Sequence, residues 1–131
     1  MIDLDTVGPM QLAHELGDAW RSWCNAAGEN ETEARFDLDV FARSLRGYRR
    51  GIDRPFTPDE KAALLSSVEW ISLELAARFT ADALEESYFG WDSAKFASRA
   101  EHNLLRARGQ WSLHCAATAC RKEREALIES S

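Results

Sequence analysis

The longest stretch without glycine or proline limits most strongly what this chain can fold into. After Pro58 neither residue occurs until Gly90. The segment Thr57-Pro58-Asp59-Glu60 supplies a hydroxyl N-cap, a proline at the first helical position and a glutamate placed for a capping box. One helix of about 29 residues over 58–86 is therefore predicted. Its apolar stripe consists of Leu64, Leu65, Val68, Ile71, Leu75, Phe79 and Ala83.

Three further segments carry apolar residues at helical spacing. They span roughly residues 11–27, 37–50 and 98–128, and the last opens with a second capping-box pattern, Ser98-Arg99-Ala100-Glu101. Gly109 inside the last helix indicates a close helix contact or a local break. The expected fold is all-α and forms a single domain over residues 1–131. It has about four main helices, and the two long ones pack together.

Composition narrows the classes of protein to which the chain can belong. It has 131 residues with 45% hydrophobic and 29% charged side chains, as a packed globular domain does. No apolar run approaches the roughly 20 residues that span a bilayer, and no signal-peptide pattern is present, so no membrane contact and a cytoplasmic location are expected. A net charge of −6 argues against nucleic acid as a partner. Three cysteines without a CxxC pair predict reduced, mostly buried thiols.

The first five residues place two carboxylates in alternation with apolar side chains. Asp3 and Asp5 alternate with Ile2 and Leu4, so in a short strand both carboxylates would point to one side. Such a pair suits a hard cation such as Mg²⁺. Two solvated acidic residues near a terminus are the alternative interpretation.

Several motifs together resemble the aminoglycoside phosphotransferase-like kinases, in particular the N-acetylhexosamine kinase branch. They are "IDLDTVGPMQLAHELGDAWRSWCN", "FDLDVFARSLRGY", "FTPDEKAALL", "ISLELAARFTADALEESYFGWD" and "EHNLLRARGQWSL". The resemblance implies the helical C-terminal lobe of an enzyme that uses Mg²⁺ and ATP. It further implies that Asp3 is the metal-binding aspartate, Asp5 an assisting ligand and Asp18 a structural brace for the catalytic loop.

The remaining parts of a kinase are not found in the sequence. It contains no His-Gly-Asp-like catalytic loop and no glycine-rich phosphate cradle. We therefore expect a lobe truncated before its metal-binding strand, inactive alone, with no catalytic residue and no bound cofactor of its own. Its partner would be the missing N-terminal lobe. The alternative is a helical interaction protein that binds itself or another chain through the former inter-lobe surface.

Other candidate residues lie on the last predicted helix. The resemblance implies that Arg106 and Arg108 lie near the substrate site of the family's C-terminal lobe, where either could contact a substrate or brace the lobe, and bracing is the favoured interpretation. His14 and His102 lack a helical partner histidine and are expected to be structural. The five tryptophans are expected mainly in the core.

Addition of Mg²⁺ and ATP is expected to leave the melting temperature unchanged. An aspartate pair without phosphate donors from a lid binds the cation too weakly to stabilise the native state. Differential scanning fluorimetry measures the shift. Phosphate transfer from ATP to a hexosamine that is abolished by Asp3→Asn would contradict an inactive lobe.

Overall fold

The computed structural model describes residues 8–131, and this part of the chain contains helices and no β-strand. The helices are α1 (Leu12–Trp23), α2 (Leu38–Gly51), α3 (Pro58–Glu85), α4 (Arg99–Ala119) and α5 (Arg121–Glu129). The prediction of an all-α fold with two long, mutually packed helices is confirmed. Asp3, Asp5 and the short strand expected there lie outside the described residues.

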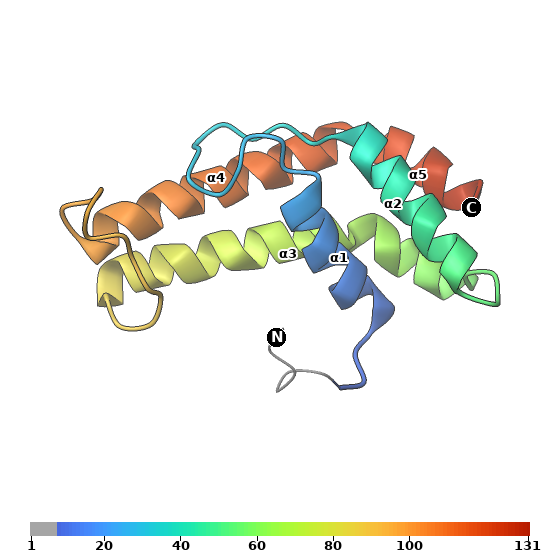
Figure 1. Ribbon diagram of the computed structural model, residues 1–131, viewed down its shortest axis with the longest axis horizontal. Helices are drawn as coiled ribbons and strands as arrows, with labels where there is room; N and C mark the ends of the chain where they lie inside the picture. The colour runs from blue at the N-terminus through green and yellow to red at the C-terminus, as the bar shows by residue number, and fades with distance from the viewer. Residues whose placement is uncertain (1–7) are drawn as a thin grey trace.

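The two long helices, α3 and α4, form an antiparallel hairpin that is the axis of the fold. Figure 1 shows them side by side, with α1 crossing α3 and with α2 and α5 at the end opposite the hairpin loop. The start of α3 follows its predicted capping box: Thr57 Oγ1 accepts the Glu60 amide at 3.1 Å, and Glu60 Oε2 accepts the Thr57 amide at 2.8 Å. Sequence therefore determines where the longest helix begins.

The second capping-box pattern is only half realised. Ser98 Oγ accepts the Glu101 amide at 3.0 Å, as predicted. The Glu101 carboxylate instead accepts the amide of Ala97 at 2.8 Å. The glutamate thus fixes the end of the 86–98 loop together with the start of α4.

The last predicted helix is in fact two helices. The prediction of one helix over 98–128 is wrong, because Cys120 adopts φ −102° and ψ 24° and separates α4 from α5. Just beyond the break, Arg124 donates to the Ala117 carbonyl from Nε at 3.1 Å and from Nη2 at 2.9 Å. α5 continues beyond α4 along the first part of α3, where Lys61 donates to the Glu129 carbonyl at 2.9 Å (Figure 1). Gly109, the other expected position for a break, lies within continuous α4.

A close crossing joins α1 to α3. Gly17 faces α3 so closely that a Cβ in its place would lie 2.7 Å from Ile71 Cδ1 and 2.8 Å from Ser67 Cβ. Beside it Leu16 and Trp20 are buried. The absence of a side chain at Gly17 allows the crossing, which brings Trp20 into the core.

The main core lies around α1, α2, the first half of α3 and α5. Its buried members are Leu16, Trp20, Cys24, Phe41, Leu45, Phe56, Leu64, Val68, Ala117 and Ile128. Trp20 is fully buried, but Trp23, Trp70 and Trp111 are 59%, 70% and 54% exposed. The expectation that the tryptophans lie mainly in the core is therefore wrong for these three. None of the helices in residues 8–131 combines the length and apolarity required to cross a bilayer.

Replacement of Gly17 by alanine is expected to destabilise the protein by about 1–3 kcal/mol, because the added methyl group overlaps α3. Gly47→Ala in α2 is the matched control. A Cβ there meets nothing within 4 Å, so the free energy of unfolding should rise by roughly 0.4–1 kcal/mol. Urea unfolding followed by circular dichroism measures both. Equal effects of the two substitutions would contradict the close crossing.

Candidate functional site

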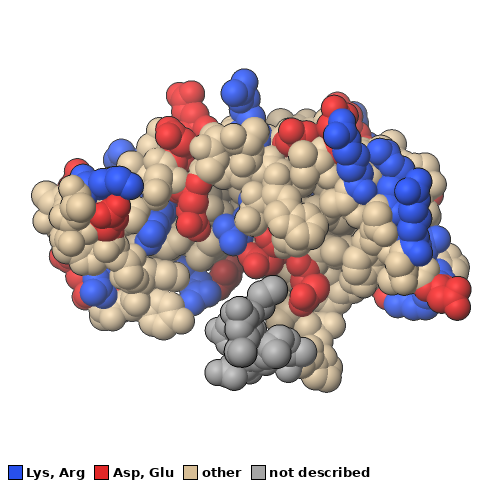
Figure 2. All heavy atoms as spheres, in the orientation of Figure 1, with Lys and Arg blue, Asp and Glu red and all other residues tan. Residues whose placement is uncertain are grey.

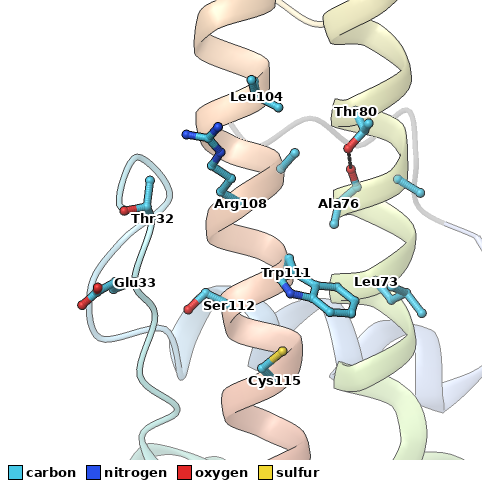
Figure 3. A pocket seen from close by; sticks show the side chains of 12 residues that line it. Thr32, Glu33, Leu73, Ala76, Thr80, Leu104, Arg108, Trp111, Ser112 and Cys115 are labelled. Carbon is cyan, nitrogen blue, oxygen red and sulfur yellow. Dashed lines mark hydrogen bonds between the residues drawn. The ribbon is translucent and has the colours of Figure 1, made fainter.

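A shallow apolar groove runs along one side of the α3–α4 hairpin. Its volume is about 740 Å³. Its apolar lining comes from both helices, as Figure 3 shows for most of these residues: Leu73, Ala76, Ala77, Leu104, Trp111 and Cys115. We call this the α3–α4 groove.

The groove follows two regular stripes of residues. On α3 the positions 73, 77 and 80 recur at helical spacing, and Leu84, which is 85% exposed, continues the row. On α4 the matching row is 104, 108, 111 and 115. Leu73 and Leu104 remain 39% and 41% exposed. The hairpin thus keeps an apolar face that none of residues 8–131 covers.

One wall of the groove is the 24–37 loop between α1 and α2. Thr32 and Glu33 line the groove from this loop, beside Ser112 of α4 (Figure 3). The Ala34 amide donates to Ser112 Oγ at 2.9 Å. The backbone of Glu31 approaches Gly109 so closely that any Cβ there would overlap its carbonyl oxygen. The contact expected at Gly109 is thus made with a loop and not with another helix.

His102 provides a third attachment of the same loop. Its imidazole is 1% exposed, and its Nε2 lies 2.9 Å from Asn30 Oδ1. On the other side Nδ1 accepts the backbone amide of Asp92 at 3.2 Å. The ring also stacks on Phe96, with centroids 4.0 Å apart. His102 therefore holds the 24–37 loop and the 86–98 loop together at the start of α4.

The 86–98 loop is tied to α3 by a buried carboxylate. Asp82 accepts the backbone amides of Ser87, Tyr88 and Phe89 at 3.0, 2.6 and 3.0 Å. Asn103 of α4 donates to the same carboxylate at 2.7 Å. Burial raises the pKa of Asp82, but the amide donors, Tyr88 first, outweigh burial and hold its pKa below the ordinary value. Asp82 therefore remains ionised and closes the hairpin.

Of the site residues that the sequence suggested, Asp18, Arg106 and Arg108 are described by the structure, and each makes different contacts. Asp18 is an exposed residue of α1, and its carboxylate pairs with Arg21 at 2.8 Å. Arg106 donates to the Gly90 carbonyl at 2.8 Å and lies over the Phe79 ring, so its contacts here hold the hairpin loop. Arg108 lines the α3–α4 groove and points toward solvent (Figure 3).

The three cysteines occupy different environments. Cys24 is buried, and desolvation is the main cause that raises its pKa to about 12, so the thiol remains protonated. Cys120 is partly buried, and burial also raises its pKa. Cys115 is exposed in the groove, so the expectation of mostly buried thiols is wrong for this residue.

One group of basic residues lies over α2, away from this groove. Figure 2 shows Lys and Arg concentrated over α2 at one end, where Arg43, Arg46 and Arg50 are exposed. The groove itself contains one cation, Arg108, and one anion, Glu33. No group of three or more His, Cys, Asp or Glu that could hold a metal ion occurs in residues 8–131. The lining of the groove is mainly apolar.

Comparison with known proteins gives no assignment: no family model matches the sequence, and no solved structure matches the fold.

Replacement of Asp82 by asparagine is expected to lower the melting temperature at neutral pH, because one acceptor oxygen is replaced by an amide that faces N–H donors. The pKa of Asp82 is lower in the folded protein than in the unfolded chain, where it is near 4. The ionised carboxylate therefore contributes fully to the free energy of unfolding above the unfolded pKa, and this contribution is lost as the pH falls through the folded pKa. Acidification should therefore destabilise the Asp82→Asn variant less than it destabilises the unaltered protein. Asp18→Asn, on the exposed face of α1, is the control, and thermal unfolding between about pH 3 and 7 measures both. Equal effects of the two substitutions would contradict this role of Asp82.

Proposed function

We propose that this chain is a helical self-association module in which two copies pack through their α3–α4 grooves. One observation carries the proposal: two parallel rows of residues keep an apolar face open to solvent along the longest helices. Contiguous apolar patches of a few hundred Å² on a monomer commonly mark interaction sites. A second two-helix face would cover this one and complete a four-helix arrangement.

The size of the face sets the expected strength of the association. Each row spans about 17 Å at 1.5 Å per residue, and two helices side by side are about 20 Å wide, which gives roughly 350 Å² per copy. Two such faces and the loop walls bury less than the ~1,200 Å² of standard stable interfaces. We therefore expect a reversible dimer that forms at high micromolar concentration.

The charges at the groove support a two-fold arrangement. Within residues 8–131 neither Arg108 nor Glu33 has an ion-pair partner. Both side chains lie on the side of the groove that the 24–37 loop forms, at different heights along the axis of α4 (Figure 3). A two-fold axis across the groove, perpendicular to the helices, places each Arg108 opposite the partner's Glu33. Such an isologous interface satisfies both charges twice.

Trp111 is the expected energetic centre of the interface. Its ring stacks on His114, with centroids 5.3 Å apart, and remains half exposed in the middle of the groove. The His114 ring is in turn held by a 3.0 Å hydrogen bond to the Glu69 carbonyl. A large aromatic ring fixed in an open apolar groove costs little further entropy on binding, as is typical of interface hot spots.

The phosphotransferase interpretation stays a prediction based on the sequence resemblance. The proposed metal ligands, Asp3 and Asp5, lie outside the described residues. Asp18 makes its ion pair with Arg21 of its own helix. The open apolar groove is the feature of the described residues that favours self-association over the kinase-lobe role.

Trp111→Ser is expected to weaken dimerisation by roughly tenfold or more, because truncation of a central aromatic residue removes at least 1.4 kcal/mol of binding free energy. Trp23→Ser is the matched control, since Trp23 is 59% exposed on α1 and lies outside the groove lining. Sedimentation velocity up to millimolar concentration gives the dissociation constants. A strict monomer throughout that range, or equal weakening by both substitutions, would overturn the proposal.

Charge reversal tests the orientation of the two copies. Arg108→Glu alone should weaken the dimer because it places two anions opposite each other, whereas the double variant Arg108→Glu with Glu33→Arg should recover most of the affinity. Sedimentation equilibrium at low ionic strength measures the coupling. Additive losses in the double variant would exclude the proposed two-fold axis.

A further inference from the structure

We infer that His102 is a proton-operated clamp that holds one wall of the α3–α4 groove in place, so that acidification releases this wall and weakens self-association. The effect on self-association rests on the proposed function. The clamp itself can be tested separately in the monomer.

The hydrogen-bond partners of the His102 ring determine its tautomer. A backbone amide can only donate, so Nδ1, which faces the Asp92 amide at 3.2 Å, must carry a lone pair. The proton of the neutral ring is then on Nε2 and is donated to Asn30 Oδ1 at 2.9 Å. Both ring nitrogens are satisfied only when the imidazole is neutral.

Protonation of the ring removes the acceptor. Nδ1 would gain a hydrogen that points at the Asp92 N–H, so the two donors would oppose each other at hydrogen-bond distance. The cation would also lie in a site that is 1% exposed and stacked against Phe96. Protonation itself leaves the Nε2–H donor to Asn30 intact. We infer that the repulsion at the Asp92 amide and the cost of burying the cation move the ring out of this position, and that this movement breaks the bond to Asn30.

The charged groups around the ring come from three elements. Arg106 of α4 and Lys95 of the 86–98 loop disfavour a second cation, whereas Asp92 of that loop and Glu29 of the 24–37 loop favour it. Burial, followed by Arg106, dominates and lowers the pKa of His102 below its ordinary value. Because the unfolded chain binds the proton more readily, the clamp is fully closed above about pH 6.5 and weakens as pH falls below that value.

The clamp is connected to the groove through the 24–37 loop. Asn30 is two residues from Thr32 and three from Glu33, which form the groove wall. Other attachments of this loop are the Ala34–Ser112 hydrogen bond, the contact at Gly109 and the 3.9 Å ion pair between Glu29 and Arg21 of α1. Loss of the His102 bond removes one of the two hydrogen bonds, Asn30–His102 and Ala34–Ser112, that join the 24–37 loop to α4. Glu33, which lies between these two positions, is then held less firmly at the position proposed for the partner's Arg108.

The other histidines are not expected to act in the same way. The His114 ring, which stacks on Trp111, uses Nδ1 to donate to the Glu69 carbonyl, and a second proton on Nε2 leaves that bond intact. His14 is exposed on α1 and lies outside the groove lining. His14→Gln is therefore a matched control for His102→Gln.

Amide hydrogen exchange tests the clamp in dilute monomer. After correction for intrinsic rates, lowering the pH from about 7.5 to 5.5 should raise exchange in residues 28–34 and 92–97 by up to roughly tenfold, because a histidine with the ordinary pKa near 6.5 in the opened state is mostly protonated at the lower pH. His102→Gln should show raised exchange at both pH values with little further change, and His14→Gln should respond like the unaltered protein. An unchanged exchange pattern in the unaltered protein would overturn the clamp.

A second variant keeps the test decisive if His102→Gln does not fold. Asn30→Ala removes a surface side chain, so residues 28–34 should exchange fast at both pH values while residues 92–97 keep their pH response. Sedimentation at the same two pH values then tests the link to the groove. A dimer unaffected by pH despite loop opening would refute the regulatory link alone. A monomer at both pH values would refute self-association and leave the clamp intact.

Discussion

The fold depends on one buried guanidinium. Arg124 of α5 is fully buried, and it donates to the Leu65 carbonyl at 2.7 Å, to the Ala117 carbonyl and to the Glu69 carboxylate. Arg121 adds a second cation to Glu69 at 2.6 Å. A buried charge that loses its partner costs on the order of 3–5 kcal/mol. Any displacement of α5 that breaks these bonds carries this cost, so the bonds fix the position of α5.

The same guanidinium connects elements that are distant in the sequence. The guanidinium of Arg124 lies over the ring of Phe36, at the end of the 24–37 loop, and its Cζ is 5.6 Å from the ring centroid. The loop, the middle of α3, the end of α4 and α5 thus meet at one polar centre inside an otherwise apolar core. Since the 24–37 loop, which forms the groove wall, ends at this point, the position of the wall also depends on Arg124.

Most helices could be predicted because their signals are local. The capping box at Thr57, the N-cap at Asp37 and the apolar spacings each involve residues within a few positions of one another. The break at Cys120 could not be predicted, because it has no glycine or proline signal and accompanies a contact between residue 124 and residues 65 and 69. Tertiary contacts determined that boundary.

The groove was only partly predictable. Its two stripes are present in the sequence as helical repeats. Periodicity alone, however, does not determine which face of each helix the core covers and which face remains exposed. The role of His102 was less accessible still, because its partners Asn30 and Asp92 come from two loops that periodicity cannot place. Gly109 did give a signal, and the structure shows that it accommodates the Glu31 backbone.

The position of Arg124 near the end of the described helices also sets an order for folding. Contacts between α3 and α4 join neighbouring segments and can form early, since local contacts close small loops. The bonds of Glu69 and of the Leu65 carbonyl can form only after Arg124, which is synthesised much later than either residue. Until then the core cluster lacks Ile128, the buried member that α5 contributes, so a ribosome-bound chain without α5 exposes apolar surface that the folded protein buries.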